Sequence, residues 1–216
     1  MAKKAIWRDE YWLLLLQAYL QEPVGTKPLY SRVMVDLSLE LHIPPHLLFS
    51  RMCQIARLDK PRLERIWQKY AEAPERLARA VRLFREMNGF GAADEFYEGV
   101  AVEETFELDF RPLAEDARLM PAMLILILDL YFRLTPVTMV AETPEVAAMA
   151  TLLKIDVQLV AEVLEVLQYC DPYLNRKEVT FNPLLLPCTQ VWQRFGNADT
   201  VQLESFAGQL KEYFVE

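Results

Sequence analysis

The order of residues in the first half of the chain returns in the second half at a nearly constant spacing. Leu13–Tyr19 (LLLLQAY) matches Ile125–Tyr131 (ILILDLY) at a shift of 112 residues. The same shift pairs Ser31 with Thr143, Leu41 with Leu153, Ile43 with Ile155, Leu47 with Leu159, Ile55 with Leu167 and Asp59 with Asp171. After an insertion of 13 residues, Trp67–Tyr70 (WQKY) matches Trp192–Phe195 (WQRF) at a shift of 125. A spacing kept over about 80 positions predicts two homologous modules, residues 1–89 and 113–216.

Each module is expected to be a bundle of five helices. Only 6 glycines occur among 216 residues, which disfavours a turn-rich all-β fold. In the first module, apolar periodicity predicts helices over 8–20, 32–41, 45–56, 61–70 and 74–88. Ser31 is expected to cap the second helix, and Asn88–Gly89 to stop the fifth. We therefore predict an all-α fold with one small β-arm near residues 178–181, in an insertion absent from the first module.

An acidic connector, residues 90–112, separates the modules. Between Phe90 and Phe110 it carries seven Asp and Glu residues and no basic one. The acids are interleaved with Phe96, Tyr97 and Phe106, a mixture similar to a docking peptide. An alternative is that the connector folds back on the first module and screens its basic residues.

The net charge of -8 is an average over two oppositely charged parts. Residues 1–87 hold 15 Lys and Arg against 10 Asp and Glu, and residues 88–216 hold 8 against 21. Acidity argues against nucleic-acid binding only in the second part. In the first module, two basic helix faces fit phosphate binding. They consist of Arg62, Arg65, Lys69, Arg76, Arg79, Arg82 and Arg85. The alternative is an ordinary solvated helix surface.

The second and third helices of each module resemble the helix-turn-helix superfamily. Val35–Met52 (VDLSLELHIPPHLLFSRM) has the expected apolar spacing, an isoleucine in the turn and a second helix that begins with polar residues. Val146–Val160 (VAAMATLLKIDVQLV) repeats the pattern. The resemblance covers about 25 residues per module, and implies that the helix beginning at Pro45 lies in a DNA major groove. The whole chain is also similar to conserved bacterial proteins without a characterised function, a likeness that implies no activity.

A helical wheel predicts which residues these helices expose. With Leu47, Leu48, Met52 and Ile55 inward, the outer stripe is His46, Ser50, Gln54 and Arg57, which can bind base edges or phosphates. In the second module the corresponding stripe is Gln158, Glu162, Val166 and Tyr169, with Glu165 beside it. Carboxylates repel phosphate, so Gln158, Glu162, Glu165 and Tyr169 are predicted to contact a protein partner instead.

We expect no catalytic residue, metal or cofactor. No serine lies in a GxSxG motif and no phosphate-binding glycine loop is present. His42 and His46 flank Pro44–Pro45 in a turn and do not share a helix face. The three cysteines are scattered without metal-ligand spacing, which fits a reducing cytoplasm, and no secretion signal or membrane span is expected. Trp67 and Trp192 are predicted to serve the core.

Three functional interpretations remain from these observations. The first is a non-enzymatic cytoplasmic interaction or adaptor protein whose second module offers an acidic surface to a protein partner. The alternative is a transcription-regulator-like protein that binds DNA through the first module. A third option is a homo-oligomer in which the basic module of one copy meets the acidic part of another.

Overall fold

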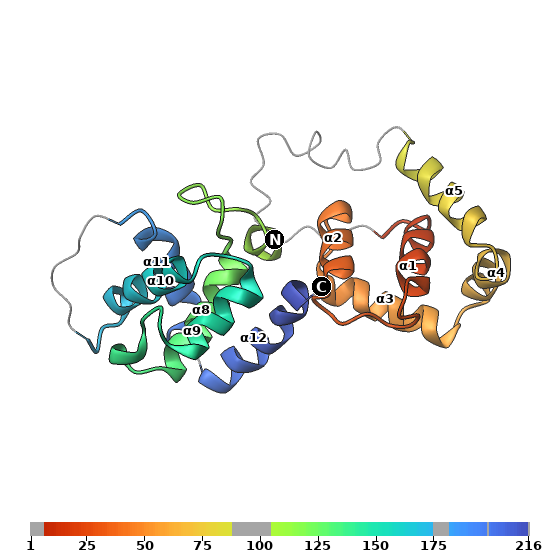
Figure 1. Cartoon of the computed structure of the whole chain (residues 1–216). Coiled ribbons are helices and arrows are strands. Elements are labelled where there is room, and N and C mark those ends of the chain that lie inside the picture. The colour runs from red at the N-terminus through yellow and green to blue at the C-terminus, as the bar shows by residue number, and fades with distance from the viewer. Residues whose placement is uncertain (1–6, 88–104, 175–181, 198, 216) are drawn as a thin grey trace. The chain divides into compact units, whose positions relative to one another are not determined.

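The computed structural model describes residues 7–87, 105–174, 182–197 and 199–215, and within them the chain is all-α, without a strand (Figure 1). The chain divides into two compact units, residues 1–103 (unit 1) and 104–216 (unit 2). The β-arm expected near residues 178–181 lies outside the described residues.

The described part of unit 1 contains five helices. They are α1 (Tyr11–Leu20), α2 (Arg32–Leu41), α3 (Pro45–Arg57), α4 (Pro61–Tyr70) and α5 (Pro74–Arg85). Three of these helices begin with proline. Proline is tolerated there because the N–H groups of the first helical turn have no partner within the helix, so the lack of an N–H costs no hydrogen bond. α1 begins at Tyr11 rather than Arg8, because residues 8–10 form a turn in which the Arg8 carbonyl accepts from the Tyr11 N–H. α5 ends at Arg85, and the predicted stop at Asn88–Gly89 lies outside the described residues.

The core of unit 1 is organised around α1, which packs on α2, α3, α4 and α5. Leu14, Leu15 and Leu16 are almost fully buried in α1. Leu48 of α3 and Val81 of α5 belong to the same buried cluster. A helix that is apolar on most sides must be covered on most sides, which explains why the other four helices surround it.

The described part of unit 2 contains six α-helices and one 3-10 turn. Its helices are α7 (Thr105–Asp109), α8 (Pro121–Arg133), the 3-10 turn η1 (Pro136–Thr138), α9 (Pro144–Leu153), α10 (Val157–Cys170), α11 (Leu185–Phe195) and α12 (Thr200–Val215). The central helix is α8, which packs on α9, α10, α11 and α12, and every residue from 122 to 131 in it is buried. Its one buried carboxylate, Asp129, accepts from Arg133 at 2.7 Å.

The predicted helix caps occupy the expected positions but do not cap through their side chains. Ser31 precedes α2, and its carbonyl accepts from the Val35 N–H at 2.9 Å. Its hydroxyl, however, is buried without a hydrogen-bond partner. Thr143 precedes α9, but its hydroxyl donates to the Thr138 carbonyl at 2.6 Å. Ser31 is therefore the N-cap residue of α2, as predicted, although its hydroxyl accepts no hydrogen bond from the helix.

The C-terminal end of the acidic connector is built into unit 2. α7 lies within it, and Asp109 and Phe110 are buried. Arg194 of α11 donates to both carboxylate oxygens of Asp109, at 2.5 and 2.8 Å. Glu107 pairs with Arg111 at 3.2 Å. These two connector carboxylates are bound by unit 2's own arginines.

Candidate interaction surfaces

The corner between α2 and α3 is a tight three-residue turn, His42-Ile43-Pro44. His42 ends α2 in the left-handed conformation, with φ 52° and ψ 39°. The Ile43 N–H then donates back to the Ser38 carbonyl at 3.1 Å, which satisfies a carbonyl at the helix end. Pro44 and Pro45 prevent α2 from continuing and start α3 at once.

The corner between α9 and α10 has the same backbone geometry. Lys154 is left-handed, with φ 57° and ψ 39°, and the Ile155 N–H donates to the Ala150 carbonyl at 3.1 Å. Asp156 then caps α10 by accepting from the Gln158 N–H at 2.7 Å. Lys154, Ile155 and Ala150 lie 112 positions after His42, Ile43 and Ser38, the shift found in the sequence.

An aromatic pair also recurs in both units. Tyr19 and Trp67 meet edge to face with ring centroids 5.9 Å apart, and Tyr131 and Trp192 do so at 5.6 Å. Trp192 is buried and Trp67 is half-buried against the core of unit 1. Trp192 therefore packs in the interior, as the sequence predicts, and Trp67 packs against the core of unit 1 while part of its surface stays exposed.

The outer stripe of α3 is open. His46, Ser50 and Arg57 are exposed, and Gln54 is half-buried. The Gln54 side-chain oxygen accepts from Lys60 at 3.1 Å.

Leu47 lies on the outer stripe as well, with 43% of its surface exposed. The prediction that Leu47 points inward is wrong: α3 begins only two residues earlier, and the neighbouring Leu48 takes the buried place. Leu47 is the surface residue that sequence reasoning missed. Its exposure depends on the helices around it, so the sequence pattern alone carried no signal for it.

The basic residues of α4 and α5 are all exposed, but some are already paired. Arg62 pairs with Asp9, Arg82 approaches Glu86 at 3.8 Å, and Arg85 donates to both oxygens of Glu40 at 2.5 and 2.8 Å. The remaining four form no ion pair with another described residue: Arg65, Lys69, Arg76 and Arg79. The predicted basic stripe is therefore partly neutralised, with four cations left available.

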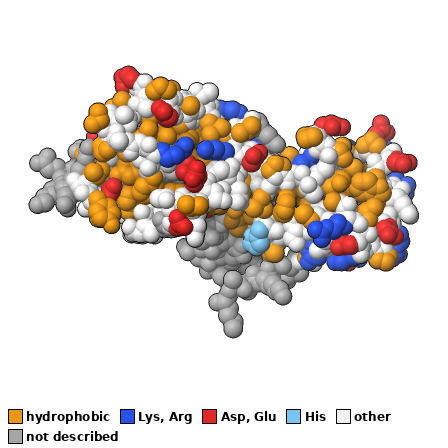
Figure 2. All heavy atoms as spheres, turned by 90° about the horizontal axis from the view of Figure 1, so that it is seen from below, with side chains coloured by type: hydrophobic (Ala, Val, Ile, Leu, Met, Phe, Trp, Pro, Cys, Tyr) orange, Lys and Arg blue, Asp and Glu red, His pale blue; other side chains and the backbone are white. Residues whose placement is uncertain are grey.

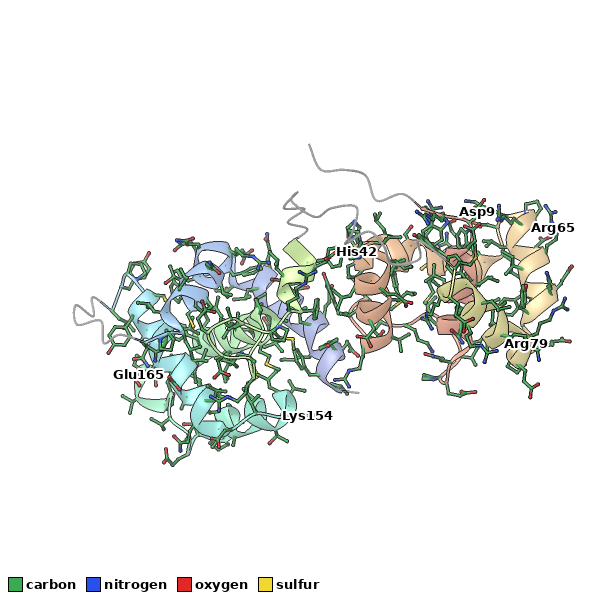
Figure 3. The ribbon with its side chains drawn as sticks, turned by 90° about the horizontal axis from the view of Figure 1, so that it is seen from above. Asp9, His42, Arg65, Arg79, Lys154 and Glu165 are labelled. Atoms are coloured by element: carbon green, nitrogen blue, oxygen red, sulfur yellow. The ribbon has the colours of Figure 1, made fainter. Side chains whose placement is uncertain are left out.

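Two of these available cations lie over one aromatic ring. Lys69 and Arg76 approach the face of Tyr70 at 5.1 and 5.7 Å, an arrangement that brings α4 and α5 charges together. Figure 3 shows Arg65 and Arg79 on the side of unit 1 opposite to His42. In the face seen in Figure 2, the Lys and Arg side chains of unit 1, on the right, are interspersed with Asp and Glu. Over residues 45–85 the balance is ten Lys and Arg to four Asp and Glu.

The corresponding face of unit 2 is partly covered. Gln158 and Glu165 are exposed, and Tyr169 is half-buried. Glu162 is exposed but accepts from the Asn182 side chain at 3.0 Å. Val166, predicted on the outer stripe, is only 3% exposed because α11 packs along α10. The prediction for Val166 is therefore wrong.

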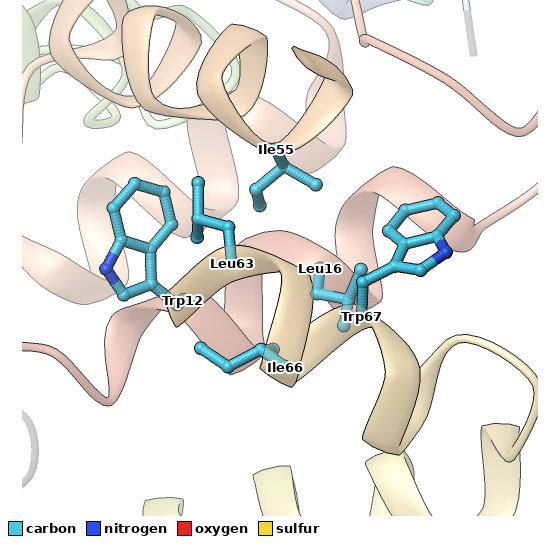
Figure 4. Close-up of a pocket in the computed structure, with 6 residues that line it drawn as sticks. All are labelled: Trp12, Leu16, Ile55, Leu63, Ile66 and Trp67. Carbon is cyan, nitrogen blue, oxygen red and sulfur yellow. The ribbon is translucent and has the colours of Figure 1, made fainter. Parts of the chain in front are cut away.

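The two units differ in how α4 lies against α3 and how α11 lies against α10. In unit 1, α4 packs mainly on α1 and α5. It leaves a small apolar depression (Figure 4), lined by Trp12, Leu16, Ile55, Leu63, Ile66 and Trp67. Ile66 and Trp67 are half-buried there, whereas their counterparts at the 125-residue shift, Val191 and Trp192, are buried. The outer face of α3 is thus freer than that of α10.

The three cysteines are free thiols. Burial raises the pKa of Cys188 and, less strongly, that of Cys170, which disfavours the reactive thiolate form of both. In the described part of the chain, no three His, Cys, Asp or Glu side chains gather where a metal ion would fit.

No helix in the described ranges is long and apolar enough to cross a membrane. Neither a family model, nor a curated protein, nor a solved structure matches the chain.

Proposed function

We propose that this protein is a non-enzymatic cytoplasmic interaction protein, and that unit 1 binds duplex DNA through α3, α4 and α5. The observation that carries the proposal is the exposed outer stripe of α3, which follows a tight corner, in a unit whose α4 and α5 also present cations that form no ion pair with another described residue. The charge balance of ten to four over residues 45–85 removes the objection posed by the acidic chain.

In this proposal α3 enters the major groove, as the second helix of a helix-turn-helix corner does. His46 and Ser50, near its N-terminal end, supply hydrogen-bonding groups for base edges. Arg65, Lys69, Arg76 and Arg79 bind phosphates, which fix the position of the helix without reading sequence. Arg62 and Arg85 contribute less, because each must first leave a carboxylate.

The test is the salt dependence of duplex binding by the full-length protein. We expect Arg65→Gln/Arg79→Gln to weaken binding and to reduce the slope of log K against log salt by about 1.8, since each lost phosphate contact removes about 0.9. A control for charge, Arg118→Gln/Lys211→Gln, removes the same charge from unit 2 and should leave the slope unchanged. Equal effects of the two double variants, or no binding by the wild type at low salt, would contradict the proposal.

A second candidate is a protein partner bound by the acidic face of α9 and α10 in unit 2. It is favoured by the exposed Gln158 and Glu165, and by the four acidic residues to one lysine over residues 144–170. The adaptor function would then join DNA at unit 1 to a basic protein surface at unit 2.

We expect Glu162→Lys/Glu165→Lys to abolish specific retention of a partner by the full-length protein. Glu204→Lys/Glu212→Lys, the same charge change on exposed positions of α12, should not. Equal retention by both variants would exclude this face.

A further inference from the structure

Leu47 occupies opposite environments from its counterpart in the other unit. It is the third residue of α3 and is 43% exposed, whereas Leu159, the third residue of α10 and 112 positions later, is 4% exposed. The two corners have the same backbone geometry, so the turn does not cause this difference. At this position unit 1 exposes an aliphatic side chain to solvent, whereas unit 2 buries the equivalent side chain.

The neighbours of Leu47 decide what it can contact. Exposed His46 lies beside it, and exposed Ser50 lies one turn further along the same side of α3. A single exposed leucine is ordinary on a protein surface. This one, however, is at the N-terminal end of the helix proposed to enter the major groove, the end whose side chains reach base edges.

Among the four base pairs, only those with thymine offer an apolar group in the major groove, the C5-methyl. The other groups at the groove edges are hydrogen-bond donors and acceptors, which an aliphatic side chain desolvates without compensation. We propose that Leu47 is a specificity-determining residue that packs against a thymine methyl group, while His46 and Ser50 bind the polar edges next to it. This inference rests on the proposed DNA binding by unit 1.

The experiment uses the full-length protein and a short duplex that the wild type selects from a random library at low salt. Each thymine is replaced in turn by deoxyuridine, which removes the methyl group and keeps the base pairing. At one or more positions we expect the wild-type affinity to fall about fourfold. This is the change that corresponds to the free energy of burying one methyl-sized group. Leu47→Ala should bind the thymine and deoxyuridine duplexes equally well.

The matched control is Leu83→Ala, which shortens a leucine that is 55% exposed on α5. It should keep the wild-type sensitivity to deoxyuridine. Because both leucines are largely exposed, neither variant is expected to lose its fold, and circular dichroism checks this.

The inference is overturned if the wild type is insensitive to every deoxyuridine, or if Leu47→Ala stays as sensitive as the wild type. DNA binding by unit 1 survives that result, because the phosphate contacts remain. If the wild type binds no duplex at low salt, the proposed function fails and the inference fails with it. If Leu47→Ala no longer binds a protein partner, and the wild type shows no dependence on the thymine methyl group, Leu47 contacts a protein. That result would also overturn the inference.

Discussion

Gly196 lies directly against the indole ring of Trp192. A methyl group on Gly196 would lie 2.6 Å from Cδ2, Cε2 and Nε1 of that ring. The ring cannot easily move away, because it packs against Tyr131 and Phe132, with centroids 5.6 and 5.7 Å distant. The bare backbone of Gly196 therefore allows α11 to end over its own tryptophan.

Substitution of this glycine should destabilise unit 2. We expect Gly196→Ala to lower the free energy of unfolding by about 1 to 3 kcal/mol, the cost of overpacking a filled site. Gly208→Ala is the matched control: a methyl group there meets nothing within 4 Å, and α12 should gain about 0.5 to 1 kcal/mol from losing a helical glycine. Urea unfolding followed by circular dichroism measures both. If both substitutions change the free energy of unfolding in the same direction, the close contact between Gly196 and Trp192 is contradicted.

The Asp109–Arg194 pair should contribute more to the free energy of unfolding than an exposed pair of the same type. The Asp109 side chain is 7% exposed and the Arg194 side chain 38%. Arg194→Met leaves a buried carboxylate without its partner, so we expect a loss of about 2 to 3 kcal/mol, reduced from the fully buried case by the exposure of the arginine. Arg62→Met breaks a pair whose members are 53% and 54% exposed, and should cost less than about 1 kcal/mol. Equal losses in urea unfolding would argue against a structural role for α7 in unit 2.

The left-handed residues of the two corners should tolerate glycine but not valine. A β-branched side chain is strongly disfavoured at positive φ, so His42→Val and Lys154→Val are each expected to cost about 1 to 2 kcal/mol. His42→Gly and Lys154→Gly should stay within about 1 kcal/mol of the wild type, because relief of strain offsets the greater freedom of the unfolded chain. Thermal unfolding of the four variants measures this, and valine variants as stable as the glycine variants would contradict the turn geometry.

Burial of two thiols predicts a pH dependence of reactivity and stability. The pKa of Cys188 is raised by burial, and that of Cys170 by the same cause. The folded protein therefore holds these protons more tightly than the unfolded chain, and this contribution is complete below the unfolded pKa of about 8.5 and is lost as pH rises above it. We expect iodoacetamide to modify Cys188 only after unfolding. Rapid labelling of Cys188 in native buffer at pH 8 would show that the thiol is not buried.

The helix starts and turns could be predicted because they depend on local chemistry. Pro45, Pro61 and Pro74 each begin a helix where the sequence places one. The turn at His42-Ile43 was also predictable, since the apolar spacing requires the chain to reverse before Pro44–Pro45. These features depend on residues a few positions apart.

Exposure and long-range pairing could not be predicted in the same way. The helical wheel gives the direction of Val166 but not whether α11 will cover it, and the same limit applies to the exposed Leu47. Asp109 pairs with an arginine 85 residues away, and the acidity of the connector gave no sign of that partner. Both depend on how helices distant in sequence pack together.

Hydrogen–deuterium exchange of the full-length protein, with and without duplex DNA at low salt, tests the central claim most directly. Binding through unit 1 predicts slower exchange in peptides that cover α3 (residues 45–57) and α5 (residues 74–85), and unchanged exchange in peptides from α10. Protection confined to unit 2, or no change in α3 under conditions where DNA is bound, would contradict the account.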